Sequence, residues 1–169
     1  LSFFNIPNTS APSIVRGLAI NHFDEAGIAA QVTNNLTIEG CHLGTDPTGT
    51  IAEGNTIGIL VQSTAGVFLS SNITIGGDTA AERNVISGNT FLGIRMFGGS
   101  DFTITGNYIG PDKSGMVALG DQGGIDLLGF DCTVGGTTAA LRNVISGNGG
   151  RGMTLNGGNN LVQGNYIGV

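Results

Sequence analysis

Short runs of alternating apolar and polar residues recur along the chain, separated by clusters of Gly and Asn. Ile94–Phe97 (Ile-Arg-Met-Phe) and Phe102–Thr105 (Phe-Thr-Ile-Thr) are typical runs. Alternation of this kind predicts short β-strands with one buried face. The Gly and Asn clusters interrupt the runs too often for a long helix. We therefore expect an all-β protein.

A longer repeat is superimposed on these runs. The hexamer Asn-Val-Ile-Ser-Gly-Asn at Asn84–Asn89 returns unchanged at Asn143–Asn148. The pentamer Gly-Asn-Tyr-Ile-Gly at Gly106–Gly110 returns at Gly164–Gly168. Internal repetition this close indicates that the chain stacks copies of one unit.

The long repeat divides into shorter steps when one Ile or Val is followed from run to run. This reference series advances by about 20 residues at each step, with one longer step between Ile59 and Ile86. A unit of that length cannot bury its own apolar face, but stacked units can. The series predicts a parallel β-helix of about eight coils of about 20 residues, three coils to a long module. Its members are Ile20, Ile38, Ile59, Ile86, Ile104, Ile125, Ile145 and Val162.

We expect residues 1–169 to form one domain that is uncapped at its C-terminal end. Residues 1–13 are apolar at their start and are a candidate N-terminal cap or extension. Three positions after the reference residue, Asn recurs at Asn89, Asn107, Asn148 and Asn165. Asn tolerates tight turns and can hydrogen-bond its copies in neighbouring coils. These four residues are predicted to form one structural column.

The motifs of residues 84–115, which end in Pro-Asp-Lys-Ser-Gly at Pro111–Gly115, resemble the modules of bacterial right-handed parallel β-helix repeat proteins. These are pectate-lyase-like solenoids of large secreted and cell-surface chains. The resemblance implies a right-handed, single-stranded parallel β-helix. It implies no single activity, because lyases, hydrolases, adhesins and inert stalks share that fold.

The composition limits which partner molecules and which location we expect for this protein. The net charge is −6 and only 6 residues are Lys or Arg, with no basic cluster, so we expect no nucleic-acid partner. The sequence contains no apolar run long enough to predict a membrane span. The charged fraction of 11% leaves a surface rich in Thr, Ser, Asn and Gly, which favours an extracellular or cell-surface location. Whether Cys41 and Cys132 pair is open.

Candidate catalytic and metal-binding residues are few. Glycoside hydrolysis needs two facing carboxyl groups. The densest acidic group is Asp112, Asp121, Asp126 and Asp131, without a paired motif, and the first three are weak catalytic candidates. Asp46 and Asp112 occupy equivalent turns and are weak candidates for Ca²⁺, which wants more oxygens than one Asp supplies. We expect solvated turn residues, no cofactor and no metal, with Ca²⁺ as the alternative.

Other reactive residues are assigned structural roles. Arg16, Arg83 and Arg142 recur in similar places and are interpreted as braces that bond loop carbonyls or a carboxylate. His22 and His42 are expected on neighbouring coils near Cys41 and Asp24, but their offsets do not match a zinc site. We interpret this proximity as incidental, with a Cys–His nucleophile pair as the alternative.

The favoured function is structural. We expect a stalk, an adhesin segment or a filament subunit that stacks end to end, or a part of a longer chain, and we expect no enzyme. The alternative is a carbohydrate-active enzyme or carbohydrate-binding β-helix with a polysaccharide partner.

Overall fold

The computed structural model describes residues 4–6, 11–63 and 70–169, and no helix occurs among them. The described chain forms 17 short strands. They are β1 (Phe4–Ile6), β2 (Ser13–Arg16), β3 (Ala19–Ile20), β4 (Ala26–Gln31), β5 (Asn34–Glu39), β6 (His42–Leu43), β7 (Ile57–Gln62), β8 (Ser71–Gly76), β9 (Val85–Ile86), β10 (Leu92–Thr105), β11 (Tyr108–Ile109), β12 (Gly123–Phe130), β13 (Thr133–Gly135), β14 (Val144–Ile145), β15 (Met153–Asn156), β16 (Leu161–Gln163) and β17 (Tyr166–Ile167).

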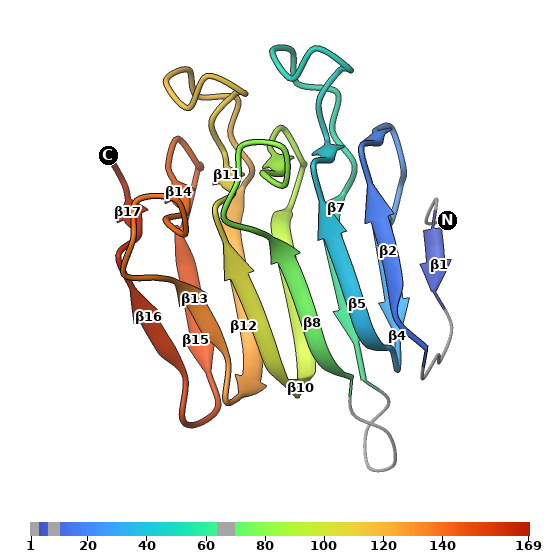
Figure 1. Ribbon diagram of the computed structural model, residues 1–169. Helices are drawn as coiled ribbons and strands as arrows, with labels where there is room; N and C mark the ends of the chain where they lie inside the picture. The colour runs from blue at the N-terminus through green and yellow to red at the C-terminus, as the bar shows by residue number, and fades with distance from the viewer. Residues whose placement is uncertain (1–3, 7–10, 64–69) are drawn as a thin grey trace.

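These strands form two parallel sheets, one of 11 strands and one of 6 (Figure 1). The long strand β10 belongs to two rows of the larger sheet, because its register shifts between Phe97 and Ser100. Its first half pairs with β7 and β12, and its second half pairs with β8 and β13. Row 1 therefore runs β1-β4-β7-β10-β12-β15, and row 2 runs β2-β5-β8-β10-β13-β16. The smaller sheet runs β3-β6-β9-β11-β14-β17.

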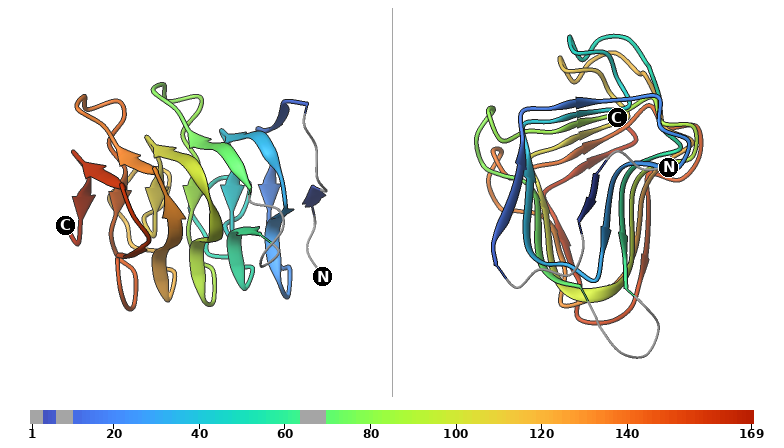
Figure 2. Two further views of the ribbon diagram at one scale, coloured as in Figure 1. Left: turned by 90° about the horizontal axis from the view of Figure 1, so that it is seen from below. Right: turned by 90° about the vertical axis from the view of Figure 1, so that its right-hand side faces the viewer.

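The chain visits row 2, the smaller sheet and row 1 in turn before it returns to row 2. We call one such passage a circuit, and Figure 2 shows successive circuits stacked along one direction. The length of a circuit varies along the chain. In row 2, the paired residues Arg16 and Glu39 are 23 positions apart, whereas Asn34 and Ser71 are 37 positions apart.

The prediction of an all-β, right-handed, single-stranded parallel β-helix with about eight coils is therefore wrong. The structure has two parallel sheets of short strands, and the chain returns to row 2 after circuits that are longer than the predicted coil. Ile38, Ile59 and Ile86 of the reference series lie in β5, β7 and β9, which belong to row 2, row 1 and the smaller sheet. One step of the series thus covers two strands of a three-strand circuit, and the repeat of the hexamer spans two circuits.

The apolar core lies between the sheets and is made mostly of Ile, Leu and Val, with Phe102 as its largest fully buried side chain. The members of the reference series from Ile20 to Ile145 are all buried, which is why the series looked regular. Cys41 and Cys132 are buried in the same core as free thiols. In the described chain, no helix is long and apolar enough to cross a membrane.

The two ends of the stack present strand edges. At the N-terminal end, β1 pairs with β4, while residues 1–3 and 7–10 lie outside the described residues. The expected cap over residues 1–13 therefore stays a prediction. At the C-terminal end, each of β15, β16 and β17 pairs with one neighbour among the described strands.

Gly76 offers a test of how closely neighbouring circuits approach. Its φ is 87°, and a Cβ built on it would lie 1.9 Å from Thr105 O and 2.6 Å from Asn107 Oδ1. We expect Gly76→Ala to lower the free energy of unfolding by about 3 kcal/mol, because a strained φ adds to overpacking. Urea unfolding of the purified chain measures this loss.

Gly17→Ala is the matched control. Gly17 has a φ of 69°, but nothing lies within 4 Å of a Cβ placed there. We expect a loss of about 1 kcal/mol from the backbone strain alone. Equal losses for the two variants would contradict the close approach at Gly76.

Candidate functional site

Side-chain amides form two ladders at the inner corners of the stack. In each ladder, the backbone N–H of one rung donates to Oδ1 of the next rung, and the side-chain Nδ2 of every Asn rung that has a following rung donates to the same oxygen. Asn107 donates in this way to Asn143 Oδ1 at 2.9 and 3.0 Å, and its Nδ2 also donates to Ile75 O at 2.9 Å. The first ladder is Asn84, Asn107, Asn143 and Asn165, and the second ladder is Asn55, Asn89, Asp121 and Asn148.

The structure divides the predicted Asn column between these ladders. Asn107 and Asn165 belong to the first ladder, and Asn89 and Asn148 belong to the second. The division follows from the circuit length, because one step of the reference series moves from one corner to another. The repeated hexamer carried the missing signal: it begins and ends with Asn, and the structure uses one of these residues in each ladder.

Asp121 is the one acidic rung of the two ladders. It is 3% exposed, and its Oδ1 accepts hydrogen bonds from the backbone N and Nδ2 of Asn89 at 2.8 and 2.9 Å. Its Oδ2 is buried without a hydrogen-bond partner among the described residues. Burial raises the pKa of Asp121 to about 8, against the lowering effect of the bonds from Asn89. A carboxyl enclosed in this way does not face a substrate.

Asp46 and Asp112 lie in equivalent turns, each closed by an antiparallel bridge. Asp46 accepts hydrogen bonds from the Thr48 hydroxyl and from the backbone N–H of Thr48, Thr50 and Ile51. These bonds, the Thr48 hydroxyl first, hold the pKa of Asp46 well below its usual range. Asp112 is bonded alike by Ser114, Met116 and Val117. Partial burial works against these bonds, yet the pKa of Asp112 is also lowered. The hydrogen bonds within the two turns therefore explain the roles of both carboxylates.

The candidate metal ligands are dispersed. In residues 4–6, 11–63 and 70–169, no group of three His, Cys, Asp or Glu could hold a metal ion. Cys41 is buried, and its thiol donates to Glu39 O at 3.3 Å. Burial raises the pKa of this thiol. His22 instead faces solvent and Glu53, with 3.8 Å between Nε2 and Oε2.

The recurring arginines join neighbouring circuits. Arg83 donates from Nε to Gly106 O at 3.1 Å and lies 4.5 Å from the Tyr108 ring centre. Arg142 repeats the arrangement with Gly164 O at 2.9 Å and the Tyr166 ring at 4.0 Å. Arg16 instead pairs with the carboxylate of Glu39. Both tyrosines belong to the repeated pentamer, two positions after the bonded glycine, but the sequence pattern did not predict their contact with the arginines.

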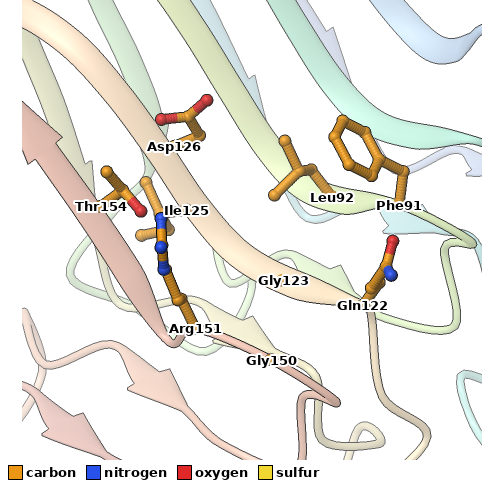
Figure 3. A pocket seen from close by; sticks show the side chains of 9 residues that line it. All are labelled: Phe91, Leu92, Gln122, Gly123, Ile125, Asp126, Gly150, Arg151 and Thr154. Carbon is orange, nitrogen blue, oxygen red and sulfur yellow. The ribbon is translucent and has the colours of Figure 1, made fainter.

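A groove of about 410 Å³ lies along row 1, beside β10, β12 and β15 (Figure 3). Asp126 and Thr154 lie on one side of it, and Phe91 and Leu92 lie on the other. Asp126 sits between Arg95 and Thr154 in the register of the sheet, and its Oδ2 lies 3.7 Å from Arg95 Nε. The side chains that line the groove include Phe91, Leu92, Gln122, Asp126, Arg151 and Thr154.

This groove interrupts the repeat of row 1. The positions equivalent to Arg95 and Asp126 in earlier circuits are Ala29 and Leu60, which are buried and apolar. Arg151 and Gln122 offer exposed polar groups, and Phe91 offers a ring that is 42% exposed. The groove can therefore hold a polar ligand by hydrogen bonds and ring contact.

The three catalytic candidates do not share this groove. Asp126 lines it, whereas Asp121 is a buried rung and Asp112 closes its own turn. Hydrolysis of a glycosidic bond by two carboxyls needs both of them beside the bond. The described lining supplies one carboxyl group, from Asp126, and one guanidinium group, from Arg151, an arrangement suited to binding.

No protein-family model, curated protein or solved structure matches this chain.

Asn107→Ala tests the ladder. The substitution removes the acceptor of Asn84 Nδ2 and the donor to Ile75 O, and both groups are buried. We expect the free energy of unfolding to fall by about 3 kcal/mol, because several buried hydrogen bonds are lost together and each contributes about 1 kcal/mol. Chemical denaturation measures the change. Asn156→Ala, at an exposed position of β15, should change stability by less than about 0.5 kcal/mol. Similar losses in both variants would argue against the ladder.

Proposed function

We propose that the chain is a structural protein, outside the cell or on its surface, that forms a rod segment of a stalk, an adhesin or a filament. The proposal rests on the strand edges that are unpaired at the two ends of the stack. Strands β2 and β3 at one end, and β15, β16 and β17 at the other, each pair with one neighbour among the described strands. Each unpaired edge is a row of backbone donors and acceptors that can accept a further strand, either from a second copy or from further residues of a longer chain.

The two ends match in direction and in row. Row 2 begins with β2 and ends with β16, and the smaller sheet begins with β3 and ends with β17. All pairs within the sheets are parallel, so a second copy can continue both sheets head to tail. Such a contact joins two different surfaces and does not close on itself, which gives open filaments.

The C-terminal edge is also apolar. Leu155, Leu161, Tyr166 and Ile167 are 40 to 49% exposed there. Exposed apolar side chains that follow an unpaired edge favour association with another chain. The low charged fraction of 11% and the surface of small polar residues support an extracellular location.

Sedimentation over a range of protein concentrations tests the proposal. We expect the mean mass to rise with concentration, and Leu161→Lys to weaken association at least tenfold, because a lysine on an edge strand opposes pairing. Phe97→Lys is the control: Phe97 is 49% exposed like Leu161, but it lies in β10, which is paired with β7 on one side and β12 on the other, and the substitution should have no effect. A wild-type chain that stays monomeric at all concentrations would overturn end-to-end stacking.

A second candidate function rests on the groove at Asp126. In row 1, the polar residues Arg95, Asp126 and Thr154 follow the apolar Ala29 and Leu60, and this change favours a polysaccharide ligand, bound by the charged groups and Phe91. Affinity electrophoresis in gels that contain neutral or acidic polysaccharides tests this. We expect retardation that Phe91→Ala abolishes and Phe130→Ala, an exposed Phe outside the groove lining, leaves unchanged. Chain cleavage that Asp126→Ala abolishes would instead make the groove catalytic.

A further inference from the structure

The acidic rung Asp121 interrupts a pattern that the other rungs of the second ladder keep. Asn55, Asn89 and Asn148 each donate from Nδ2 to a backbone carbonyl of the smaller sheet, all at 3.1 Å. The three carbonyls belong to Ile20, Leu43 and Ile109, the second residues of β3, β6 and β11. Each of these carbonyls also accepts a backbone N–H, so each takes two hydrogen bonds.

The oxygen Oδ2 of Asp121 takes the place of the amide nitrogen. A Cβ built on Gly27, Gly58 or Gly124 would lie 3.0 to 3.2 Å from Nδ2 of the adjoining Asn rung. A Cβ built on the equivalent Gly93 would lie 2.7 Å from Asp121 Oδ2. Oδ2 therefore points where the ladder requires a donor.

The two groups that would accept a hydrogen bond from that donor are Ile86 O and Asn148 Oδ1, which are both acceptors. Register makes Ile86 the counterpart of Leu43 and Ile109 in the smaller sheet. Within the described residues, Ile86 O accepts from Gly110 N and lacks the amide donor of its counterparts. Asn148 Oδ1 accepts the backbone N–H of Asp121 at 3.0 Å, and the Asn rungs show that the same oxygen also takes the side-chain donor. A carboxylate would set negative charge against these oxygens, whereas a carboxylic acid supplies the missing O–H.

We propose that Asp121 is a pH-sensitive latch, in which the neutral acid donates from Oδ2 to complete the second ladder and ionisation opens the ladder at this rung. Burial raises the pKa of Asp121 to about 8, in agreement with the geometry. Asp121 lies near Ile86 of β9, Gly93 of β10 and Ile109 of β11. Its neighbouring rungs are Asn89 and Asn148. All of these are uncharged, and no charged side chain contributes to the shift.

The direction of the pH effect follows from proton binding. The folded pKa of about 8 exceeds the ordinary value of 3.8, so between these limits the folded chain holds a proton that the unfolded chain has released. Stability from this group is complete below about pH 4 and is lost as the pH rises towards 8. Within that window, the folding equilibrium constant should fall by up to about tenfold per pH unit.

Chemical unfolding of the wild type and Asp121→Asn between pH 5 and pH 9, at a protein concentration where the chain is monomeric, tests the latch. Asparagine restores the amide donor at every pH. We expect the folding constant of the wild type, relative to the variant, to fall about tenfold per pH unit up to pH 8 and then to level off. Parallel pH profiles of the two chains would overturn the proposal.

Carbon NMR of the Asp121 carboxyl is a second readout that needs no substitution. In the folded wild type, we expect its chemical shift to remain that of the acid at pH 6 and to titrate well above the ordinary value. A transition near pH 4 would overturn the latch. Neither measurement depends on end-to-end association, so the latch and the structural proposal can fail separately.

Discussion

The structure depends on satisfying the backbone at its inner corners. Parallel strands in three rows hydrogen-bond to the circuits before and after them, but the chain must turn sharply between rows. A turning residue cannot take part in strand pairing, and a buried N–H or C=O left unpaired is costly. The Asn rungs solve this at two corners, because one amide supplies an acceptor to a neighbouring rung and donors to a carbonyl and to the next rung. Hydrogen bonding at the corners is therefore as necessary to the fold as the pairing of the strands.

This constraint explains where the chain varies and where it does not. Neighbouring rungs of the second ladder are separated by 34, 32 and 27 positions, so the corner stays in register while the chain between corners changes in length. Between Asn89 and Asp121, the extra residues form the surface turn of Asp112, whose carboxylate accepts hydrogen bonds from within the turn. Lengthening a loop whose ends stay fixed costs little free energy. Arg83 and Arg142 then tie such segments to the next circuit through a carbonyl and a Tyr ring.

The buried positions could be predicted from the sequence, but which strands lie side by side in successive circuits could not. Ile38, Ile59 and Ile86 are all buried, as alternation within each run indicates, because alternation reports which face of a strand is covered. It does not report which strand lies alongside. Three similar strands follow one another in every circuit, so a series that skips every second strand looks as regular as the true one. The hexamer with Asn at both ends was the better guide, since its two residues define different corners.

The candidate site was harder to predict for the same reason. Arg95 and Asp126 are distant in the sequence, and only the true register makes them neighbours across β10 and β12. The burial of Asp121 likewise depends on the corner to which it belongs, since its sequence neighbours Gly120 and Gln122 are only partly buried or exposed. Local sequence carries residue type and pattern, whereas the environment that raises the pKa of a carboxyl is assembled from distant circuits.

The direction of the ladders bears on how a rod would grow. Each rung donates towards the rung that follows it, so Asn148 and Asn165 direct their backbone N–H groups towards the C-terminal edge. A further circuit would complete the ladders by offering an amide oxygen at each corner. The first circuit of a second copy offers Leu18 at the corner of the first ladder, since Leu18 O and Cys41 O accept equivalent bonds. It offers Phe23 at the corner of the second ladder, where Phe23 N donates to Asn55 Oδ1. Both side chains pack on the apolar core instead. Head-to-tail stacking would therefore join the strands and the core but not the amide ladders, and a rod built in this way is weakest at the joints between copies.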